Sequence, residues 1–359
     1  MMKIEILTFH RAYNYGAVLQ AYALQTYLKD RGCDVYIIDY YNKNVYSNYK
    51  LINWKLIFRK NIIKSVFAII EQANHFTIKR KKKKVYTNFF NHYYRLISWH
   101  EITNLDLIII GSDQVWNPNI VGGFKNAYFG FGIPKNINLI SYAASTEGIT
   151  LNENNTIWYK KMLERFKVIS VRERAFKNYL EKIIDMPVYL SLDPTLLMPF
   201  SFWKKFGKIS LYKNYILVYQ ARRSLHILTF AEKIAKQINA QIVILTSNVS
   251  TVDHKYVVVD NASPEEFVGL FENARCVIAL SFHAVVFSVV SQVPFYAIKN
   301  KDGWDNRIES LLDELDLMDR FIDVNEDINY TSIDYSKTMS QIERLKAMSV
   351  SYLDRVLGL

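Results

Sequence analysis

Hydrophobic residues along the chain fall into short runs that alternate between two spacings. Residues 3–9 and 35–40 are runs rich in Ile, Leu and Val, which is typical of strands. Between them, residues 17–28 repeat apolar side chains at helical spacing, and Gly32 follows where a helix would end. A strand, a helix and a strand in this order predict parallel pairing through a right-handed crossover.

The same alternation continues to the end of the chain. Strands are expected in the segments DLIIIGSD, NLISYAAS, FKVISV and VYLSLD, and at residues 215–219, 241–245, 256–259, 276–280 and 294–298. Helices are expected at residues 225–238, 264–273, 283–291, 305–314 and 339–356, the second of them opened by a capping box at 263–266. This order predicts an α/β protein of two Rossmann-like, doubly wound domains that face each other across a cleft.

The length of 359 residues exceeds the usual size of one hydrophobic core, so two domains are expected. We place the N-terminal domain at residues 1–200, with a basic helical insertion at about 50–100. The C-terminal domain follows at 201–338. A last helix at 339–359 would pack back on the N-terminal domain.

Residues 277–298 have the length of a membrane span and no charged residue apart from His283. Ser281, Gln292 and Pro294 interrupt this run, which predicts a strand, a loop, a helix and a second strand instead. Each piece is too short to cross a bilayer. The segment is therefore expected in a buried α/β core.

The two cysteines, Cys33 and Cys276, each stand at the start of an apolar run without a second thiol nearby. A disulfide framework or a cysteine-rich metal site is therefore not expected, and a cytoplasmic location fits best. Glu5 and His10 interrupt the apolar region that a secretion signal would need.

Positive charge is concentrated in one segment. Residues 50–100 contain twelve Lys or Arg and a single acidic residue, Glu71, so the net charge of +11 for the whole chain resides in this window. An amphipathic helix is predicted here by an apolar stripe at Phe58, Ile62, Val66 and Ile69. Two interpretations remain open: a solvated face, and a peripheral contact with anionic lipids at the inner membrane face.

A loop at residues 10–16 lies between the first strand and the first helix. In doubly wound sheets, ligands bind beyond the carboxyl ends of the strands, where helix N-termini offer unpaired N–H groups. Asn14, Tyr15 and Gly16 occupy that place. A tight turn explains Gly16 equally well, because a single glycine is not a dinucleotide-binding fingerprint.

Seven further stretches follow one another from residue 14 to residue 312. They are NYGAVLQAYALQ, IIIGSDQVWNP, ISYAAS, ISVRERA, SLDPTLLM, SFHAVVFSVVSQVPF and DNRIESLL. Together they resemble the polysaccharide pyruvyl transferase family. The resemblance implies a fold like that of the GT-B glycosyltransferases, phosphoenolpyruvate as the donor substrate, no further cofactor, and a sugar acceptor that is soluble or lipid-linked. The product would carry pyruvate as a ketal on two sugar hydroxyls, in an exopolysaccharide or capsule.

The resemblance also implies the residues that bind phosphoenolpyruvate. The family's Arg and His positions match Arg172 and His283, the latter in the C-terminal, donor-binding domain. Family members carry Arg two residues before that histidine, whereas this chain has Ser281. Ser281 and the helix N-terminus then supply neutral donors to the phosphate, or the donor differs.

Ketal formation requires an acid, a base and a set of groups that bind the anionic donor. We assign His283 to the phosphate, as a ligand or proton donor, with a core histidine as the alternative. Arg172 would bind the carboxylate or phosphate, unless it pairs with Glu173 or Glu147. Arg307 is a second candidate for this role, and a surface ion pair is the alternative.

Asp113 follows a strand and would accept a proton from the acceptor hydroxyl, although a cap of the next turn explains it as well. Gln114 and Trp116 would hold the sugar by hydrogen bonding and stacking, with core packing as the alternative for Trp116. The loop at residues 14–16 would touch the acceptor or the donor. Asp193 precedes a proline and is interpreted as a turn former.

The seven histidines are scattered and no Asp-x-Asp motif occurs, so no metal site is expected. Two other functions are considered. A GT-B glycosyltransferase that uses a nucleotide sugar would share the fold. A nucleic-acid binder would use residues 50–100, but no nucleic-acid module is recognisable there, so no nucleic-acid partner is expected.

Overall fold

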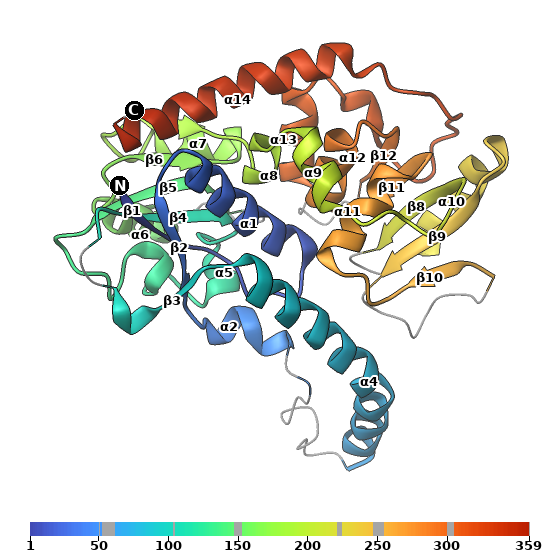
Figure 1. The fold of residues 1–359 in the computed structure, drawn as a ribbon, viewed down its shortest axis with the longest axis horizontal. Coiled ribbons are helices and arrows are strands. Elements are labelled where there is room, and N and C mark those ends of the chain that lie inside the picture. The colour runs from blue at the N-terminus through green and yellow to red at the C-terminus, as the bar shows by residue number, and fades with distance from the viewer. Residues whose placement is uncertain are drawn as a thin grey trace.

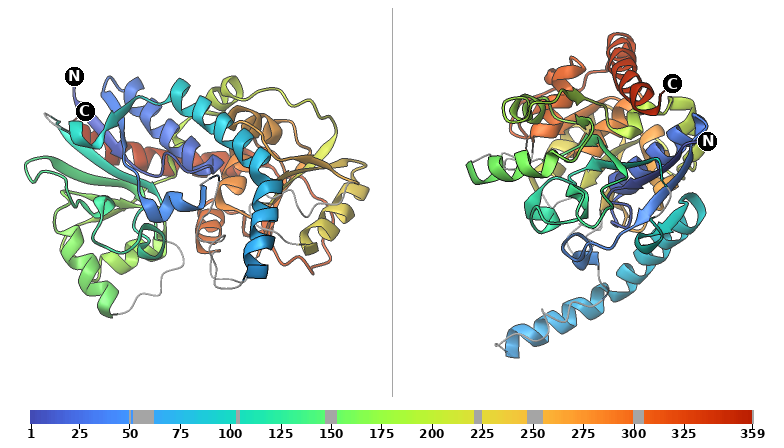
Figure 2. Two further views of the ribbon diagram at one scale, coloured as in Figure 1. Left: turned by 90° about the horizontal axis from the view of Figure 1, so that it is seen from below. Right: turned by 90° about the vertical axis from the view of Figure 1, so that its left-hand side faces the viewer.

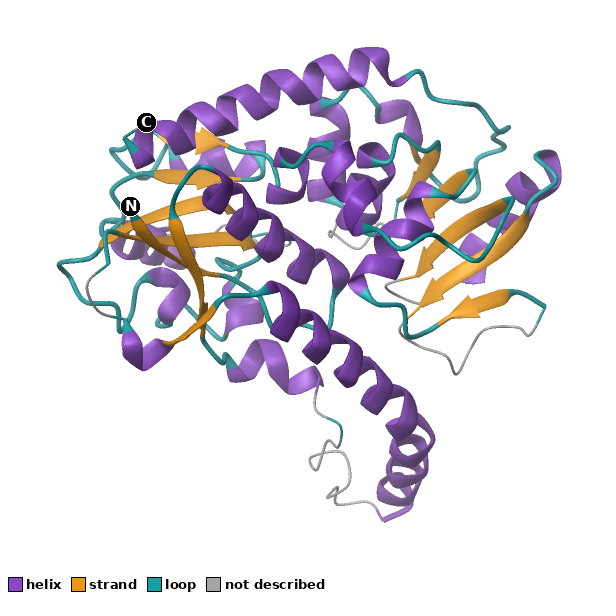
Figure 3. Ribbon diagram, in the orientation of Figure 1, coloured by secondary structure: helices purple, strands orange, loops and turns teal. Residues whose placement is uncertain are grey.

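The computed structural model describes residues 1–49, 51, 62–102, 105–146, 153–220, 225–246, 255–299 and 305–358. Within these residues the chain forms two parallel β-sheets, one from each half of the sequence, with helices packed around them (Figures 1 and 3). The predicted fold class, two doubly wound α/β units, is therefore confirmed.

The first sheet has the strand order β3-β2-β1-β4-β5-β6-β7. Its strands are β1 (Lys3–Leu7), β2 (Asp34–Asp39), β3 (Leu96–Ser98), β4 (Leu107–Asp113), β5 (Asn138–Ala144), β6 (Ile169–Val171) and β7 (Val188–Leu190). In the centre of this sheet, Ile6 of β1 pairs in parallel with Ile37 of β2 and Ile109 of β4. All three side chains are fully buried, because helices cover both faces of a parallel sheet.

The second sheet repeats this arrangement in the order β10-β9-β8-β11-β12-β13. Its strands are β8 (Tyr215–Gln220), β9 (Gln241–Thr246), β10 (Val257–Val259), β11 (Cys276–Ala279), β12 (Phe295–Ile298) and β13 (Phe321–Ile322). In each sheet the strand order reverses at the centre, between β1 and β4 and between β8 and β11. The loops that leave these strands run to opposite faces, which opens a crevice at their carboxyl ends.

Helices connect the strands of both sheets. In the first half they are α1 (Tyr15–Asp30), α2 (Lys43–Tyr46), α4 (Ile62–Tyr93), α5 (Pro118–Val121), α6 (Glu153–Leu163), α7 (Arg174–Leu180), α8 (Pro194–Leu197) and α9 (Phe200–Phe206). In the second half they are α10 (Leu225–Gln237), α11 (Pro264–Glu272), α12 (Phe282–Val290), α13 (Asn306–Glu314) and α14 (Tyr335–Leu357). The predicted capping box is present at α11, where Ser263 and Glu266 accept each other's backbone N–H.

Helix α4 carries most of the basic segment. Its C-terminal end packs on the first half, whereas its N-terminal part projects away from both sheets (Figures 1 and 2). The large buried side chains at this end are Tyr86, Phe89 and Phe90. Of the predicted apolar stripe, Ile69 is exposed, while Phe58 and the side chains of Ile62 and Val66 lie outside the described residues.

Helix α14 contacts both halves as it crosses the molecule (Figure 1). Near its start, the Tyr335 hydroxyl donates a hydrogen bond to the carbonyl oxygen of Val293 at 2.7 Å. Farther along, the Ser349 hydroxyl accepts one from the Leu192 N–H at 2.9 Å. The helix begins about one turn earlier than the sequence pattern predicted, so it touches the second half before it reaches the first.

Residues 277–298 are divided as predicted into β11, α12 and β12. The helix in this segment, α12, is completely buried between its neighbours. Among the described helices, none combines the length and the apolar composition needed to cross a lipid bilayer.

Candidate active site

A cavity of about 710 Å³ lies between the two halves. Its walls combine the ends of β4 and β8 with the segments that follow β1 and β11, which are the central strands of the two sheets. The polar residues that line it are Asn14, Asn44, Tyr49, Asp113, Gln114, Asn119, Tyr219, Ser281, His283 and Arg307. The cavity therefore coincides with the crevices that the strand order predicts in both sheets.

Two helices begin at this cavity. Asn14 caps α1 and accepts a hydrogen bond from the N–H of Ala17 at 3.2 Å. Ser281 caps α12 and accepts one from the N–H of Ala284 at 3.2 Å. The first turn of a helix carries partial positive charge on its N–H groups, so two such termini at one cavity favour an anionic ligand.

Gly16 allows the starts of α1 and α12 to meet. A Cβ atom built on Gly16 would lie 2.0 Å from Nδ1 of His283, so any side chain here would overlap the imidazole ring. The sequence alone allowed two interpretations of Gly16, a tight turn or a ligand-binding loop. The structure instead places Gly16 in the first turn of α1, directly against the ring of His283. The close approach of the histidine explains why glycine is required.

Asp193 connects His283 with Arg172. Its Oδ2 accepts a hydrogen bond from Nη1 of Arg172 at 2.6 Å and lies 3.5 Å from Nε2 of His283. Its Oδ1 accepts the N–H of Thr195 at 3.0 Å. Burial alone would raise the pKa of Asp193, but His283 and Arg172 outweigh it and hold that pKa well below its ordinary value. Asp193 is thus a charged carboxylate that fixes both partners from behind the cavity.

Arg172 and Arg307 approach the same ring and the same carboxylate. Their guanidinium carbons lie 4.4 Å and 5.5 Å from the ring centroid of Phe282. Oδ1 of Asp113 lies 3.8 Å from Nη2 of Arg172 and 3.6 Å from Nη1 of Arg307. Arg307 lines the cavity, whereas the Arg172 side chain is only 4% exposed and does not line it. A ligand in the cavity would meet Arg307 first.

Glu173 is a second buried carboxylate beside Arg172. Its Oε1 lies 3.9 Å from Nε of Arg172 and accepts a hydrogen bond from the Ser145 hydroxyl. Burial raises the pKa of Glu173, and Arg172 opposes this only in part. The other partner considered for Arg172, Glu147, lies outside the described residues. The described contacts therefore give Arg172 ion pairs with Asp193, Glu173 and Asp113.

The structure brings most of the predicted site residues together. Those that line the cavity are Asn14, Asp113, Gln114, Ser281, His283 and Arg307. Trp116 does not, because it is fully buried and its Nε1–H donates to the carbonyl oxygen of Tyr128 at 2.9 Å. Its expected stacking on a sugar is corrected to core packing. Tyr15 is also buried, and its hydroxyl donates to the carbonyl oxygen of Ala262 at 2.8 Å, so it joins the two halves instead of touching a ligand.

Asp193 and Tyr219 are site residues that the sequence interpretation missed. Asp193 does cap α8 as its interpretation as a turn former implies, but it also holds His283 and Arg172. Its position directly after an apolar strand, like that of Asp113, was the available signal. Tyr219 lies in β8 and lines the cavity from the second sheet, and nothing in its local sequence distinguishes it from a core tyrosine.

The donor groups at the cavity suit an anion. They comprise an imidazole, a guanidinium and two helix N-termini, all of which bind phosphate or carboxylate oxygens. In the described part of the chain, no group of three or more His, Cys, Asp or Glu side chains is arranged to hold a metal ion.

The architecture defines the class of the protein, which is a GT-B-like fold of two Rossmann-like units. UDP-N-acetylglucosamine 2-epimerase from Rickettsia bellii is 12% identical with a TM-score of 0.45, over 99% of this chain and 98% of its own. A Listeria monocytogenes protein described as the same epimerase is 8% identical with a TM-score of 0.50, over 96% and 87%. The glycosyltransferase SnogD from Streptomyces nogalater is 11% identical with a TM-score of 0.37, over 97% and 94%. Of these, only the Listeria monocytogenes protein reaches a TM-score of 0.50, and at 8% identity its similarity shows the fold alone.

The sequence identifies the family within this class. The model of the polysaccharide pyruvyl transferase family matches residues 14–302, which is most of the chain. The chain therefore belongs to the polysaccharide pyruvyl transferase family, and this membership implies a transferase of polysaccharide biosynthesis with a sugar acceptor. A comparison with curated proteins gives no match.

Proposed function

We propose that the protein transfers the pyruvyl group of phosphoenolpyruvate to two hydroxyls of one sugar and thereby forms a pyruvate ketal in a surface polysaccharide. The observation that supports this most directly is that His283, Arg307 and the N-termini of α1 and α12 meet at one cavity. Phosphoenolpyruvate carries a phosphate and a carboxylate, and this set of groups offers separate partners for the two anions.

In this proposal the phosphate of the donor binds at the start of α12. The Ser281 oxygen already accepts the N–H of Ala284, and its hydroxyl hydrogen remains to donate to a phosphate oxygen. Neutral donors of this kind would replace the arginine that the resemblance leads one to expect two residues before the histidine. Arg307 then binds the carboxylate through its planar fork of N–H groups.

His283 is the proposed proton donor to the methylene carbon of phosphoenolpyruvate. Protonation of that carbon makes C2 cationic, and the first sugar hydroxyl attacks C2 while Asp113 takes its proton. The bond between C2 and the phosphate oxygen then breaks with its electron pair on phosphate, and the second hydroxyl attacks C2. The second hydroxyl also loses its proton as it attacks, so two protons leave the sugar. One replaces the proton that was placed on the methylene carbon, and the other leaves with the phosphate. The products are the ketal and inorganic phosphate.

Asp193 and Arg172 act as positioning residues in this scheme. A protonated imidazole at position 283 would face the carboxylate of Asp193 at 3.5 Å, which stabilises the charge and fixes the ring. Arg172 in turn keeps Asp193 charged through the 2.6 Å hydrogen bond. We therefore expect substitution of Asp193 or Arg172 to reduce the turnover rate more than the affinity for phosphoenolpyruvate.

Thermal stability with candidate donors tests the proposal. A ligand present at 100 times its Kd stabilises a protein by about 2.7 kcal/mol, so phosphoenolpyruvate should raise the unfolding temperature of the full chain, whereas UDP-sugars should not. Arg307→Ala and His283→Ala should each abolish this shift. Lys177→Ala, which removes a lysine paired with Glu181 on α7, is the control and should retain it.

The reverse outcome would contradict the proposal. Stabilisation by UDP-sugars without stabilisation by phosphoenolpyruvate would assign the cavity to a nucleotide-sugar glycosyltransferase. Release of inorganic phosphate from phosphoenolpyruvate in the presence of an acceptor then measures turnover directly.

A further inference from the structure

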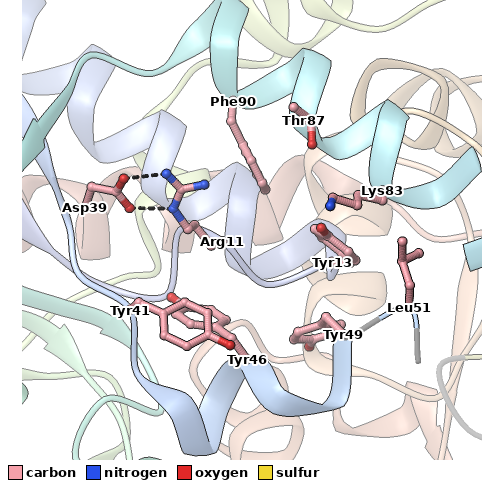
Figure 4. A pocket seen from close by; sticks show the side chains of 10 residues that line it. All are labelled: Arg11, Tyr13, Asp39, Tyr41, Tyr46, Tyr49, Leu51, Lys83, Thr87 and Phe90. Atoms are coloured by element: carbon pink, nitrogen blue, oxygen red, sulfur yellow. Dashed lines mark hydrogen bonds and ion pairs between the residues drawn. The ribbon is translucent and has the colours of Figure 1, made fainter. Parts of the chain in front are cut away.

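A second cavity, of about 600 Å³, lies in the first half next to the candidate active site (Figure 4). It is bounded by the loop after β1, the segment after β2, the turns around α2, and helix α4. Tyr49 lines both cavities, so the two spaces adjoin at this residue. Like the first cavity, it lies at the carboxyl ends of parallel strands, where ligands bind in folds of this kind.

Tyrosine rings form a large part of its wall. The tyrosines that line it are Tyr13, Tyr41, Tyr46 and Tyr49. The rings of Tyr13 and Tyr49 lie 5.3 Å apart between centroids, and those of Tyr41 and Tyr46 lie 5.5 Å apart. A tyrosine ring has an apolar face and a hydroxyl that donates and accepts hydrogen bonds, and of these four residues Tyr46 is buried while Tyr41 is exposed. A sugar presents the complementary surface, since its C–H faces are apolar and its edge carries hydroxyls.

A fixed guanidinium forms one side of the cavity. Arg11 donates to both carboxylate oxygens of Asp39 through Nε and Nη2 (Figure 4). His10 contacts the same carboxylate, with its Nε2 3.2 Å from Oδ1 of Asp39. Burial opposes the charge on Asp39, but His10 and Arg11 hold its pKa well below the ordinary value. Arg11 uses two of its five N–H donors on Asp39, which leaves three for a ligand.

Lys83 of α4 lies on the opposite wall (Figure 4). Among the described residues, Lys83 forms no salt bridge, whereas the charge of Arg11 is already balanced by Asp39. The cavity therefore has a net positive charge from Lys83 and an oriented guanidinium. Lysine and arginine at one site are typical partners of a phosphate group.

We propose that this cavity binds the acceptor as a glycosyl phosphate. The sugar ring lies on the tyrosines, the phosphate contacts Lys83 and Arg11, and the reacting hydroxyls extend past Tyr49 toward Asp113 and His283. The role of this ligand as the acceptor rests on the proposed function. Binding of a glycosyl phosphate to the cavity can be measured independently of that function. It also gives α4 a role at the site, because α4 supplies Lys83 and the wall at Thr87 and Phe90.

Calorimetric titration of the full chain tests the inference. The probes are the 1-phosphates of glucose, galactose, mannose and N-acetylglucosamine, together with glucose, glucuronate and inorganic phosphate. At least one sugar 1-phosphate should bind, and Lys83→Ala should weaken it about tenfold, the loss expected for one charge-assisted hydrogen bond. Tyr41→Ala should also weaken it, because the exposed ring of Tyr41 lines only this cavity.

Lys79→Ala is the matched control, since Lys79 lies one turn earlier on α4 and lines neither cavity. Binding of none of the four sugar 1-phosphates would overturn the inference, as would equal affinity for inorganic phosphate or for glucuronate. Loss of affinity in Lys79→Ala as large as in Lys83→Ala would indicate general attraction to a basic helix and would also overturn it.

The two proposals fail differently. Lys83→Ala and Tyr41→Ala should leave the thermal shift with phosphoenolpyruvate unchanged, because neither residue lines the first cavity. If phosphoenolpyruvate stabilises the protein and no sugar 1-phosphate binds, the acceptor assignment is wrong and the donor assignment stands. If a sugar 1-phosphate binds with the predicted loss in Lys83→Ala but phosphoenolpyruvate does not, the proposed reaction is wrong and this site stands.

Discussion

Gly16 and His283 form a pair in which one residue provides the space that the other fills. The imidazole occupies the volume that a Cβ atom on Gly16 would need, and the ring is held from its other nitrogen by Asp193. The position of the proposed proton donor therefore depends on the absence of a single methyl group 267 residues away in sequence. Such dependence is a consequence of the close packing of protein interiors.

We predict that Gly16→Ala lowers the free energy of unfolding and abolishes the thermal shift with phosphoenolpyruvate, because the new methyl group displaces His283. In a His283→Ala background the clash is relieved. There Gly16→Ala should be neutral or stabilising, since Ala has the higher helix propensity. Urea unfolding of the four proteins in a double-mutant cycle measures this. An equal cost in both backgrounds would show that His283 is not the group displaced.

Glu5 is an acidic residue within the hydrophobic core of the first sheet. It lies in β1 between Tyr36 of β2 and Ile108 of β4 and is fully buried. Among the described residues, neither of its carboxylate oxygens has a hydrogen-bond partner. Burial raises the pKa of Glu5 to about 7, although the charge of Lys3 opposes the rise. The folded protein therefore keeps this carboxyl protonated at pH values where the unfolded chain has lost the proton.

We predict that Glu5→Gln stabilises the protein above pH 7 relative to the wild type. As pH rises from 4.5, the ordinary value, to about 7, the unfolded chain releases the proton and the folded protein does not, so wild-type stability falls through this window. The neutral amide does not titrate. The urea midpoints of the variant and the wild type should therefore be similar at pH 5 and differ at pH 8. A difference independent of pH would contradict the assigned pKa.

At the scale of elements, α4 has two distinct parts. Its C-terminal end is anchored on the first half by buried aromatic residues, and its N-terminal part extends away from the body (Figure 2). Lysines on the helix differ accordingly: Lys82 lies over the ring of Tyr86, and burial lowers its pKa to about 8. Arg80, Lys81 and Lys84 are exposed. Exposed positive charge beside a projecting helix is suited to contact with an anionic surface.

We predict that the protein co-sediments with phosphatidylserine vesicles at low salt and is released as salt rises. Basic residues near an anionic bilayer contribute about 1 kcal/mol each, so the triple variant Arg80→Gln, Lys81→Gln, Lys84→Gln should lose most of this binding. The variant leaves Lys82 and Lys83 in place, so its affinity for sugar 1-phosphates should be unchanged. If the wild-type protein stays in the supernatant at low salt, the basic residues form a solvated face and the lipid contact should be dropped.

At the scale of the whole molecule, one hydrophobic core extends through both halves. The same cluster of buried side chains includes Ile6 of the first sheet, Val277 of the second sheet and Leu353 of α14. Tyr15 adds a direct connection, because its ring stacks on Phe267 with centroids 4.4 Å apart. We therefore expect the two halves to unfold together.

We predict that Tyr15→Phe lowers the free energy of unfolding by about 1 kcal/mol, because the ring still stacks but the carbonyl of Ala262 loses its buried hydrogen bond. Unfolding followed by far-UV and near-UV circular dichroism should show one coincident transition in both the variant and the wild type. Tyr41→Phe, at an exposed tyrosine, is the control and should leave the free energy of unfolding unchanged. Two separated transitions in the wild type would contradict the shared core.

Much of this protein is determined by local sequence. The spacing of apolar residues was sufficient for the α/β class, and Ser263 with Glu266 was sufficient for the start of α11, because both depend on interactions within a few residues. Positions after apolar strands indicated Asp113 and His283 at the cavity, since parallel strands present their carboxyl ends on one edge. Motif order was sufficient for the family.

Tertiary structure alone decided which of these residues a ligand can reach. Arg172 follows a strand as Asp113 does, yet it is buried beside Asp193 and Glu173 and does not line the cavity. Trp116 is three residues from Asp113 but points into the core. Burial and ion pairing depend on which strands are neighbours and which helix ends meet, and those contacts join residues that are far apart in the chain, so no local pattern can specify them.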